Sequence, residues 1–191
     1  LKETYPNSYF STLVDNDLIL EQINNLAGKK SMKVGLWMDV NVGMNRTGIV
    51  PDEKAFKLFK SLTTSENIIA EGFHVYDGHL RNPNFNQRKK DCDTAFEKVL
   101  LLKAKLEKES FNVKHIIAGG SPSFPVHALR DDVDLSPGTT LLWDAGYGDL
   151  FPEMKMLHAA VLVTRIISKP SEGILCLDLG HKSLASEMPF P

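Results

Sequence analysis

Apolar runs alternate with amphipathic stretches along most of the chain. Runs rich in β-branched and aromatic residues predict strands at residues 8–14, 32–40, 68–76, 113–118 and 139–143. Apolar residues three and four positions apart predict helices at residues 16–27, 51–62 and 85–111. A loop with a short helix is expected over residues 121–130. Repeated strand–helix units of this kind are typical of parallel sheets with right-handed crossovers.

Residues at the predicted helix ends support these limits. Asp15 or Asn16 suits the N-cap of the first helix, and Gly28 suits its end. Pro51, with two acidic residues behind it, suits the first turn of the second helix.

The pattern changes after about residue 152. Two β-rich runs, at residues 156–167 and 174–179, are separated only by turn residues 169–173, which predicts an antiparallel pair. We therefore expect a parallel α/β domain followed by a β-rich domain, with the boundary near residues 151–155.

Composition excludes several classes of protein. With 42% hydrophobic residues, 24% charged residues and a net charge of −2, the chain is ordinary for a globular fold and shows no electrostatic case for nucleic acid or membrane binding. No apolar run suits a transmembrane helix, and the first residues lack the apolar core of a signal peptide. Cys92 and Cys176 form no CxxC pair, which favours a reduced, cytoplasmic protein. The chain does not begin with Met, which hints at a trimmed piece.

In parallel barrels the chemistry lies at the carboxyl ends of the strands. The second predicted strand ends in a polar loop with Asp39, Asn45 and Arg46, whose guanidinium suits an anionic or phenolate oxygen. The alternative is a solvated turn. After the third strand, Tyr76 shares one face with His74 and suits a flat ring, and His79 suits acid–base chemistry. The alternative is a structural role for each.

Two later segments suit an anion. Gly119, Gly120 and Ser121 follow a strand and offer backbone N–H groups and a hydroxyl, although the P-loop spacing is absent. A Pro-Gly pair at 137–138 favours a type II turn that aims the N–H groups of Gly138 and Thr139 at the same anion. Ordinary turns are the alternative for both.

Together these segments resemble the fold-type III pyridoxal-phosphate enzymes of the alanine racemase class, in the branch of D-threonine aldolase and D-serine dehydratase. The segments are DVNVGMNRTGI (39–49), GFHVYDGHLR (72–81), AGGSPSF (118–124), SPGTTLLWDAGY (136–147) and LDLGHKSLASE (177–187). The resemblance implies a partial (β/α)8 TIM-type barrel, of its later strands, over residues 1–152. It implies the beginning of a C-terminal β domain over residues 153–191.

Site residues follow from the resemblance one by one. It places Arg46 near the phenolic oxygen of pyridoxal 5'-phosphate and Tyr76 beside the pyridine ring. The phosphate is expected at Gly119, Gly120, Ser121, Gly138 and Thr139. Further candidates for the pocket wall are Asp39, Asn45, His79, Asp144 and Tyr147.

The chain departs from the family at three places. Asn82 stands where many D-threonine aldolases have a histidine, and His79 lies nearby. The catalytic candidates that the resemblance implies are Tyr76 and His79. The Schiff-base lysine of the first barrel strand and the metal ligands late in the β domain have no match, and His181 is followed by Lys182 and Ser183. We therefore expect an internal fragment that is inactive alone, and we assign no metal ligands.

The parent protein is expected to be a lyase of amino-acid metabolism that cleaves a β-hydroxy-D-amino acid to glycine and an aldehyde. The resemblance implies pyridoxal phosphate, a divalent metal in the full-length protein and a homodimer. D-Serine dehydration or amino-acid racemisation is an alternative on the same scaffold. A non-catalytic module that binds pyridoxal phosphate or phosphate is another.

Overall fold

The computed structural model describes residues 1–180, 183 and 184. The strands are β1 (Ser11–Val14), β2 (Val34–Asp39), β3 (Ile68–Val75), β4 (His115–Ala118), β5 (Asp134–Leu135), β6 (Ile166–Ser171) and β7 (Ile174–Leu177). The α-helices are α1 (Asp17–Lys29), α2 (Glu53–Thr64), α3 (Phe85–Lys108), α4 (Phe124–His127) and α5 (Ala145–Leu150). Short 3-10 helices are Thr139–Leu141 and Pro152–Met154.

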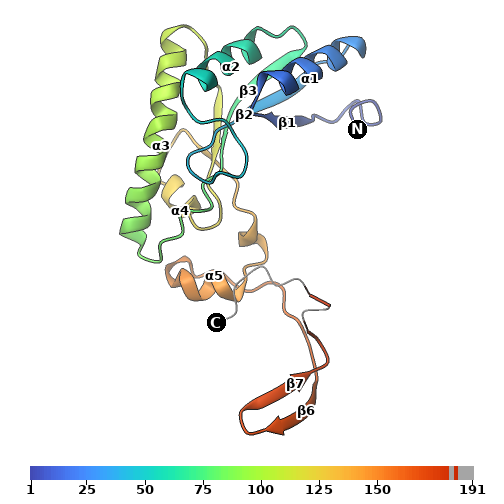
Figure 1. Cartoon of the computed structure of the whole chain (residues 1–191), viewed down its shortest axis with the longest axis vertical. Coiled ribbons are helices and arrows are strands. Elements are labelled where there is room, and N and C mark those ends of the chain that lie inside the picture. The colour runs from blue at the N-terminus through green and yellow to red at the C-terminus, as the bar shows by residue number, and fades with distance from the viewer. Residues whose placement is uncertain (181–182, 185–191) are drawn as a thin grey trace. The chain divides into compact units, whose positions relative to one another are not determined.

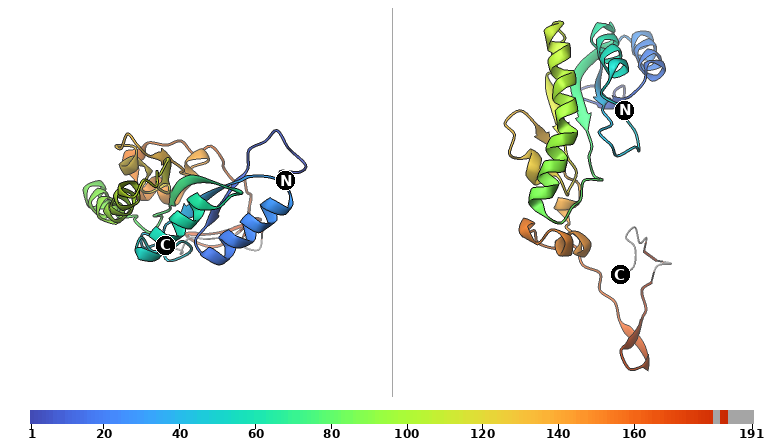
Figure 2. Two further views of the ribbon diagram at one scale, coloured as in Figure 1. Left: turned by 90° about the horizontal axis from the view of Figure 1, so that it is seen from above. Right: turned by 60° about the vertical axis from the view of Figure 1, so that its left-hand side comes forward.

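The chain divides into two compact units, Leu1–Gly138 and Thr139–Pro191. In the first unit, β1 to β5 form one parallel sheet whose strands follow their order along the chain. Helices α1, α2 and α3 lie side by side along one face of this sheet (Figures 1 and 2). Sequential parallel strands with helices on one face are the wall of a (β/α) barrel, so the predicted fold class is confirmed. Among the described residues, no helix is both long and apolar enough to cross a membrane.

The core lies between the sheet and its helices. Alternate strand residues face the helices, including Leu36 and Met38 of β2 and Phe73 of β3, and all three are fully buried. Phe59 of α2 meets Phe73 edge to face, with ring centres 5.1 Å apart. The apolar stripe of α3 that periodicity predicted packs here too, with Phe96 buried. This packing holds the strands and therefore the residues at their carboxyl ends.

The end of the first helix differs from the prediction. Asn16 is its N-cap, because its side chain accepts a hydrogen bond from the Ile19 amide. Gly28, however, lies inside the helix, which continues through Lys29. Ser31 adopts the left-handed conformation with φ of +50°, and the Met32 amide donates to the Ala27 carbonyl at 3.0 Å. A serine therefore takes the position that glycine commonly occupies after a helix.

The predicted strand at residues 139–143 is wrong. Thr139–Leu141 is a 3-10 helix, and the Trp143 amide donates to the Thr139 carbonyl at 2.7 Å. Trp143 has φ of +52°, which interrupts extended backbone. The strand beside β4 is instead the short β5, where Ile117 pairs with Asp134. The type II turn is also wrong, because Gly138 is absent from the described glycines with positive φ.

The second unit contains the antiparallel pair that the sequence predicted. Strands β6 and β7 pair with each other, but β6 begins only at Ile166, so residues 156–165 are not a strand as expected. Residues 169–171, assigned to the turn, belong to β6, and the turn is at Glu172 and Gly173. The predicted domain boundary after residue 152 lies within this unit and stays a prediction. In the segment 177–187 that resembled a β domain, residues 181, 182 and 185–187 lie outside the described residues.

Candidate functional site

The carboxyl ends of β2, β3 and β4 are neighbours at one edge of the parallel sheet (Figure 1). Asp39, the last residue of β2, pairs in register with His74 of β3. Val75, the last residue of β3, pairs with Ala118, the last residue of β4. Three of the segments that the sequence predicted to be functional therefore start from adjacent positions.

Tyr76 links these three segments. Its ring centre lies 4.5 Å from Cζ of Arg46, a cation–π contact. A Cβ added to Gly120 would come within 2.8 Å of the ring, and one added to Gly78 would overlap the tyrosine hydroxyl. The Tyr76 ring therefore fits here only because Gly78 and Gly120 have no side chains. Arg46 is exposed, so its guanidinium can still donate hydrogen bonds to a ligand beside the ring.

Asp39 and His74 form a pair on the same sheet. Oδ1 of Asp39 lies 2.7 Å from Nδ1 of His74, and Asp39 is buried. Burial raises the pKa of Asp39, but hydrogen bonds from His74 and Thr47 and the charges of His74 and Arg46 outweigh it, so the pKa lies below its usual value. An ionised carboxylate only accepts, so Nδ1 of His74 carries the proton of this hydrogen bond. The sequence placed His74 on the Tyr76 face but did not select it as a site residue.

The loop after β2 is held by its own hydrogen bonds. Oδ1 of Asn41 accepts from the amides of Gly43 and Asn45 at 3.0 and 3.1 Å. The Asn45 side chain accepts from Nδ2 of Asn41 at 3.0 Å, and the Gly48 amide donates to Asp15 at 3.1 Å. These bonds order the loop, although Gly43, Asn45 and Arg46 are exposed, so the solvated-turn alternative stays open. Asn45 stabilises the loop that presents Arg46.

His79 packs against that loop. A Cβ added to Gly43 would come within 2.9 Å of Nε2 of His79. Nδ1 of His79 is buried and has no hydrogen-bond partner in the described part of the chain. A buried polar atom without a partner is costly, so this nitrogen is suited to bonding a ligand or water.

The glycine loop after β4 differs in detail from a phosphate cradle. The Gly119 amide donates to the Val75 carbonyl at 3.1 Å, and the Gly120 amide donates to Oγ of Ser123 at 3.0 Å. Both predicted amide donors are therefore bonded within the protein. Gly119 has φ of +89°, which favours glycine, and Gly120 must lack a side chain because of Tyr76. Ser121, at the corner of the turn, remains the predicted phosphate contact.

The other predicted residues fall in two places. In the first unit, Oγ of Ser136 donates to the Gly119 carbonyl at 3.4 Å, and nothing lies within 4 Å of a Cβ added to the nearby Gly138. In the second unit, Asp144 caps α5 by accepting from the Tyr147 amide at 2.8 Å. Thr139 lies in the second unit as well. Asp144 has a structural role here, and a pocket role for these residues stays a prediction.

Sequence reasoning missed a buried polar group behind the strand ends. It contains Asp77, Ser123 and His127, which are at most 2% exposed. One signal was available: alternation along β3 places Asp77 in step with the core residues Phe73 and Val75. A carboxylate in step with core positions must find buried partners.

Cys92 lies beside this group and is fully buried. Burial, and then the charge of Asp77, raise the pKa of Cys92 to about 12. Because the thiolate is the nucleophile, we expect iodoacetamide at about pH 8 to leave Cys92 unmodified in the folded protein and to alkylate the exposed Cys176. Peptide mapping by mass spectrometry, with and without urea, measures both sites. Equal alkylation of Cys92 in folded and unfolded protein would contradict this assignment.

Comparisons with known proteins show the family and the fold of the chain. The family described as alanine racemase, N-terminal domain, matches residues 3–144. A 3-hydroxy-D-aspartate aldolase of Paracoccus denitrificans is 23% identical over 188 residues, covering 93% of this chain and 49% of that protein. The solved D-threonine aldolase of Filomicrobium marinum superposes with a TM-score of 0.86 at 22% identity, covering 94% of this chain and 49% of that one. The structure of PipY from Synechococcus elongatus, solved with pyridoxal phosphate (PLP) bound, has a TM-score of 0.54 at 15% identity. The match covers 68% of this chain and 58% of PipY. The chain thus spans about half the length of the curated relative.

Proposed function

The chain belongs to the alanine racemase N-terminal domain family, and on this premise we propose that it carries the cofactor-holding part of a pyridoxal-phosphate-dependent aldolase. The observation that carries the proposal is the contact of Arg46 with the Tyr76 ring, 4.5 Å apart, where three strand ends meet beside a glycine loop. Two similar proteins support the proposal, because one is named 3-hydroxy-D-aspartate aldolase and the other D-threonine aldolase.

The residues present fit pyridoxal phosphate. The cofactor has a flat ring, a phenolic oxygen and a phosphate, and we assign Tyr76 to the ring and Arg46 to the phenolic oxygen. Ser121 is assigned to the phosphate, together with Gly138 of the same unit. When bound, pyridoxal phosphate supplies an electron sink for the charge that develops on the amino-acid substrate.

The chain's own groups then bind and move protons. The reaction breaks the Cα–Cβ bond of a β-hydroxy-D-amino acid, removes the proton of the β-hydroxyl and adds a proton to Cα. His79, with a buried nitrogen that lacks a described partner, is the candidate base for the hydroxyl proton. His74, oriented by Asp39 at 2.7 Å, is a second group able to hold a proton at Nε2.

The test uses the full-length gene product. On adding pyridoxal phosphate, we expect a visible absorbance band, and we expect D-threonine to yield glycine and acetaldehyde while L-threonine does not. Glycine is measured by chromatography, with and without a chelator to detect a divalent metal. Pyruvate from D-serine would indicate a dehydratase, and L-amino acid from the D-form a racemase. A full-length protein that shows no band contradicts the cofactor assignment.

A further inference from the structure

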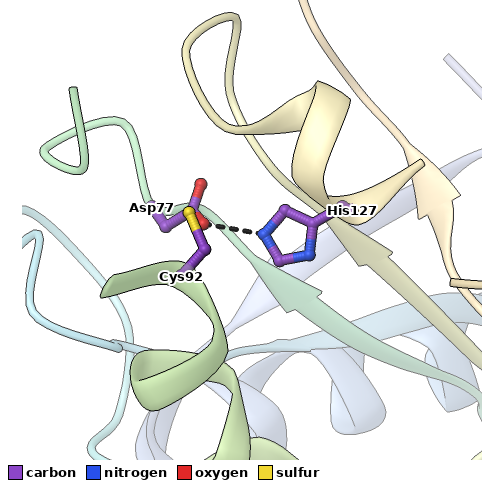
Figure 3. Close-up of side chains that lie close together, drawn as sticks. All are labelled: Asp77, Cys92 and His127. Carbon is purple, nitrogen blue, oxygen red and sulfur yellow. Dashed lines mark hydrogen bonds and ion pairs between the residues drawn. The ribbon is translucent and has the colours of Figure 1, made fainter. Parts of the chain in front are cut away.

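A buried polar cluster lies next to the carboxyl ends of β3 and β4. Asp77 follows β3, Ser123 precedes α4 and His127 ends α4. Figure 3 shows the Asp77 carboxylate and the His127 ring facing each other, with the Cys92 sulfur beside them. These residues come from three separate segments, so the cluster joins β3, α3 and α4.

The hydrogen bonds of the cluster form one continuous chain. Nε2 of His127 lies 2.8 Å from Oδ2 of Asp77. The Ser123 hydroxyl donates to the other carboxylate oxygen of Asp77, and the Gly120 amide donates to Oγ of Ser123 at 3.0 Å. Each of the buried acceptors named here has a donor, which is the arrangement that a low-dielectric interior requires.

The protonated nitrogen of His127 can be assigned from its outer neighbour. Nε of Arg130 donates to Nδ1 of His127 at 3.4 Å, and an arginine nitrogen has no acceptor capacity. Nδ1 therefore accepts, and Nε2 carries the proton that it donates to Asp77. Arg130 is held in turn by Asp93 of α3, whose carboxylate lies 2.5 Å from its Nη2.

At its inner end the chain of bonds shapes the glycine loop. The Ser123 amide donates to the Gly120 carbonyl at 3.1 Å, so residues 120–123 form a tight turn with Ser121 at its corner. The same turn places Gly120 against the Tyr76 ring. The position of Ser121 relative to Tyr76 therefore depends on how Ser123 is held.

A metal ion is a different explanation for this cluster, because ligand atoms of Asp77, Cys92 and His127 lie within 4.8 Å of one another. The hydrogen bonds argue against it. Nε2 of His127 carries a proton, and both oxygens of Asp77 already accept. Metal binding needs a neutral nitrogen lone pair and a thiolate. The donors of the cluster are satisfied without a cation.

We propose that Asp77, Ser123 and His127 are positioning residues that hold the Gly120–Ser123 turn in the form that receives the phosphate of the cofactor. The inference rests on the proposed function and extends it, since it assigns phosphate recognition to a buried network that does not touch the ligand. Its consequence is selective: the network governs affinity for the phosphorylated cofactor and leaves affinity for the pyridoxal ring unchanged.

The experiment compares pyridoxal phosphate with pyridoxal, which lacks the phosphate, in the full-length gene product. Dissociation constants are measured by absorbance titration of the cofactor-free protein. We expect His127→Leu and Ser123→Ala to weaken pyridoxal phosphate binding roughly tenfold to a hundredfold, because each leaves a buried partner unsatisfied. The dissociation constant for pyridoxal should change by less than about threefold, because pyridoxal lacks the phosphate that the turn receives.

Matched variants separate positioning from stability. His127→Gln keeps an N–H donor for Asp77 and should restore most of the preference for pyridoxal phosphate that His127→Leu loses. Cys92→Ala leaves the chain of hydrogen bonds intact and should keep that preference. Ser123→Ala removes a single oxygen and keeps the test available if His127→Leu does not fold.

Four results would overturn the inference. Equal losses for pyridoxal phosphate and pyridoxal would mean a structural role only. Stoichiometric zinc in the purified wild type, lost in Cys92→Ala, would mean a metal site. Unchanged affinities in His127→Leu and Ser123→Ala would remove the positioning role while the proposed function stands, whereas a wild type that binds neither compound removes both.

Discussion

Replacing Gly72 with alanine is expected to lower the free energy of unfolding of the first unit by about 3–5 kcal/mol. Gly72 has φ of +144°, at the place where the pairing of β2 and β3 shifts register. An added Cβ would overlap the backbone carbonyl of His115, its partner in β4. Neither backbone can yield without disturbing the β3–β4 pairing, so strain and overlap add. Urea unfolding followed by circular dichroism measures the loss.

The control for this prediction is Gly138→Ala. Nothing lies within 4 Å of a Cβ added there, and its φ is not in the positive range. We expect a change in unfolding free energy of less than about 0.5 kcal/mol. A Gly72→Ala protein as stable as the Gly138→Ala protein would show that the sheet does not require a glycine at the bulge.

Replacing Arg46 with alanine is expected to have the largest effect on function. In the full-length gene product we expect turnover of D-threonine to fall by about 10²–10³-fold, the usual loss when one well-placed donor to a developing charge is removed. Folding should change little, because Arg46 is exposed and its main contact is the Tyr76 ring. Steady-state kinetics and a thermal melt of the same preparation separate the two effects.

Two variants complete the Arg46 experiment. Arg46→Lys keeps the charge but not the planar fork of donors, so partial activity is expected. Lys54→Ala removes an exposed cation of α2 and should leave both readouts unchanged. Thermal stability and activity that fall in parallel in Arg46→Ala would contradict the assignment of Arg46 to the cofactor.

Several elements of the first unit could be predicted from local pattern. Asn16 caps α1 as predicted. Helix α2 begins later than predicted, because Asp52 is its N-cap and Pro51 lies before the cap instead of in the first turn. The predicted apolar residues Phe96, Val99 and Leu106 of α3 are buried. Periodicity carries this information because a helix or strand that buries one face must repeat its apolar residues at the period of that element. The same logic placed Asp39 and Tyr76 at strand ends, where the parallel sheet brings their segments together.

Features that apolar periodicity does not encode, both local turns and long-range contacts, decided the rest. Residues 139–143 have strand-forming side chains, yet turn hydrogen bonds and the positive φ of Trp143 prevail, and β5 is a two-residue strand paired with β4. The hydrogen bonds of Asp77 to Ser123 and His127 join residues 46 and 50 positions apart. No periodic signal encodes such pairs, because their energy depends on which segments the folded sheet places side by side. Local sequence thus specified β1 to β4 and the polar residues at the carboxyl ends of β2 to β4, whereas only the folded sheet specified β5 and the buried network of Asp77, Ser123 and His127.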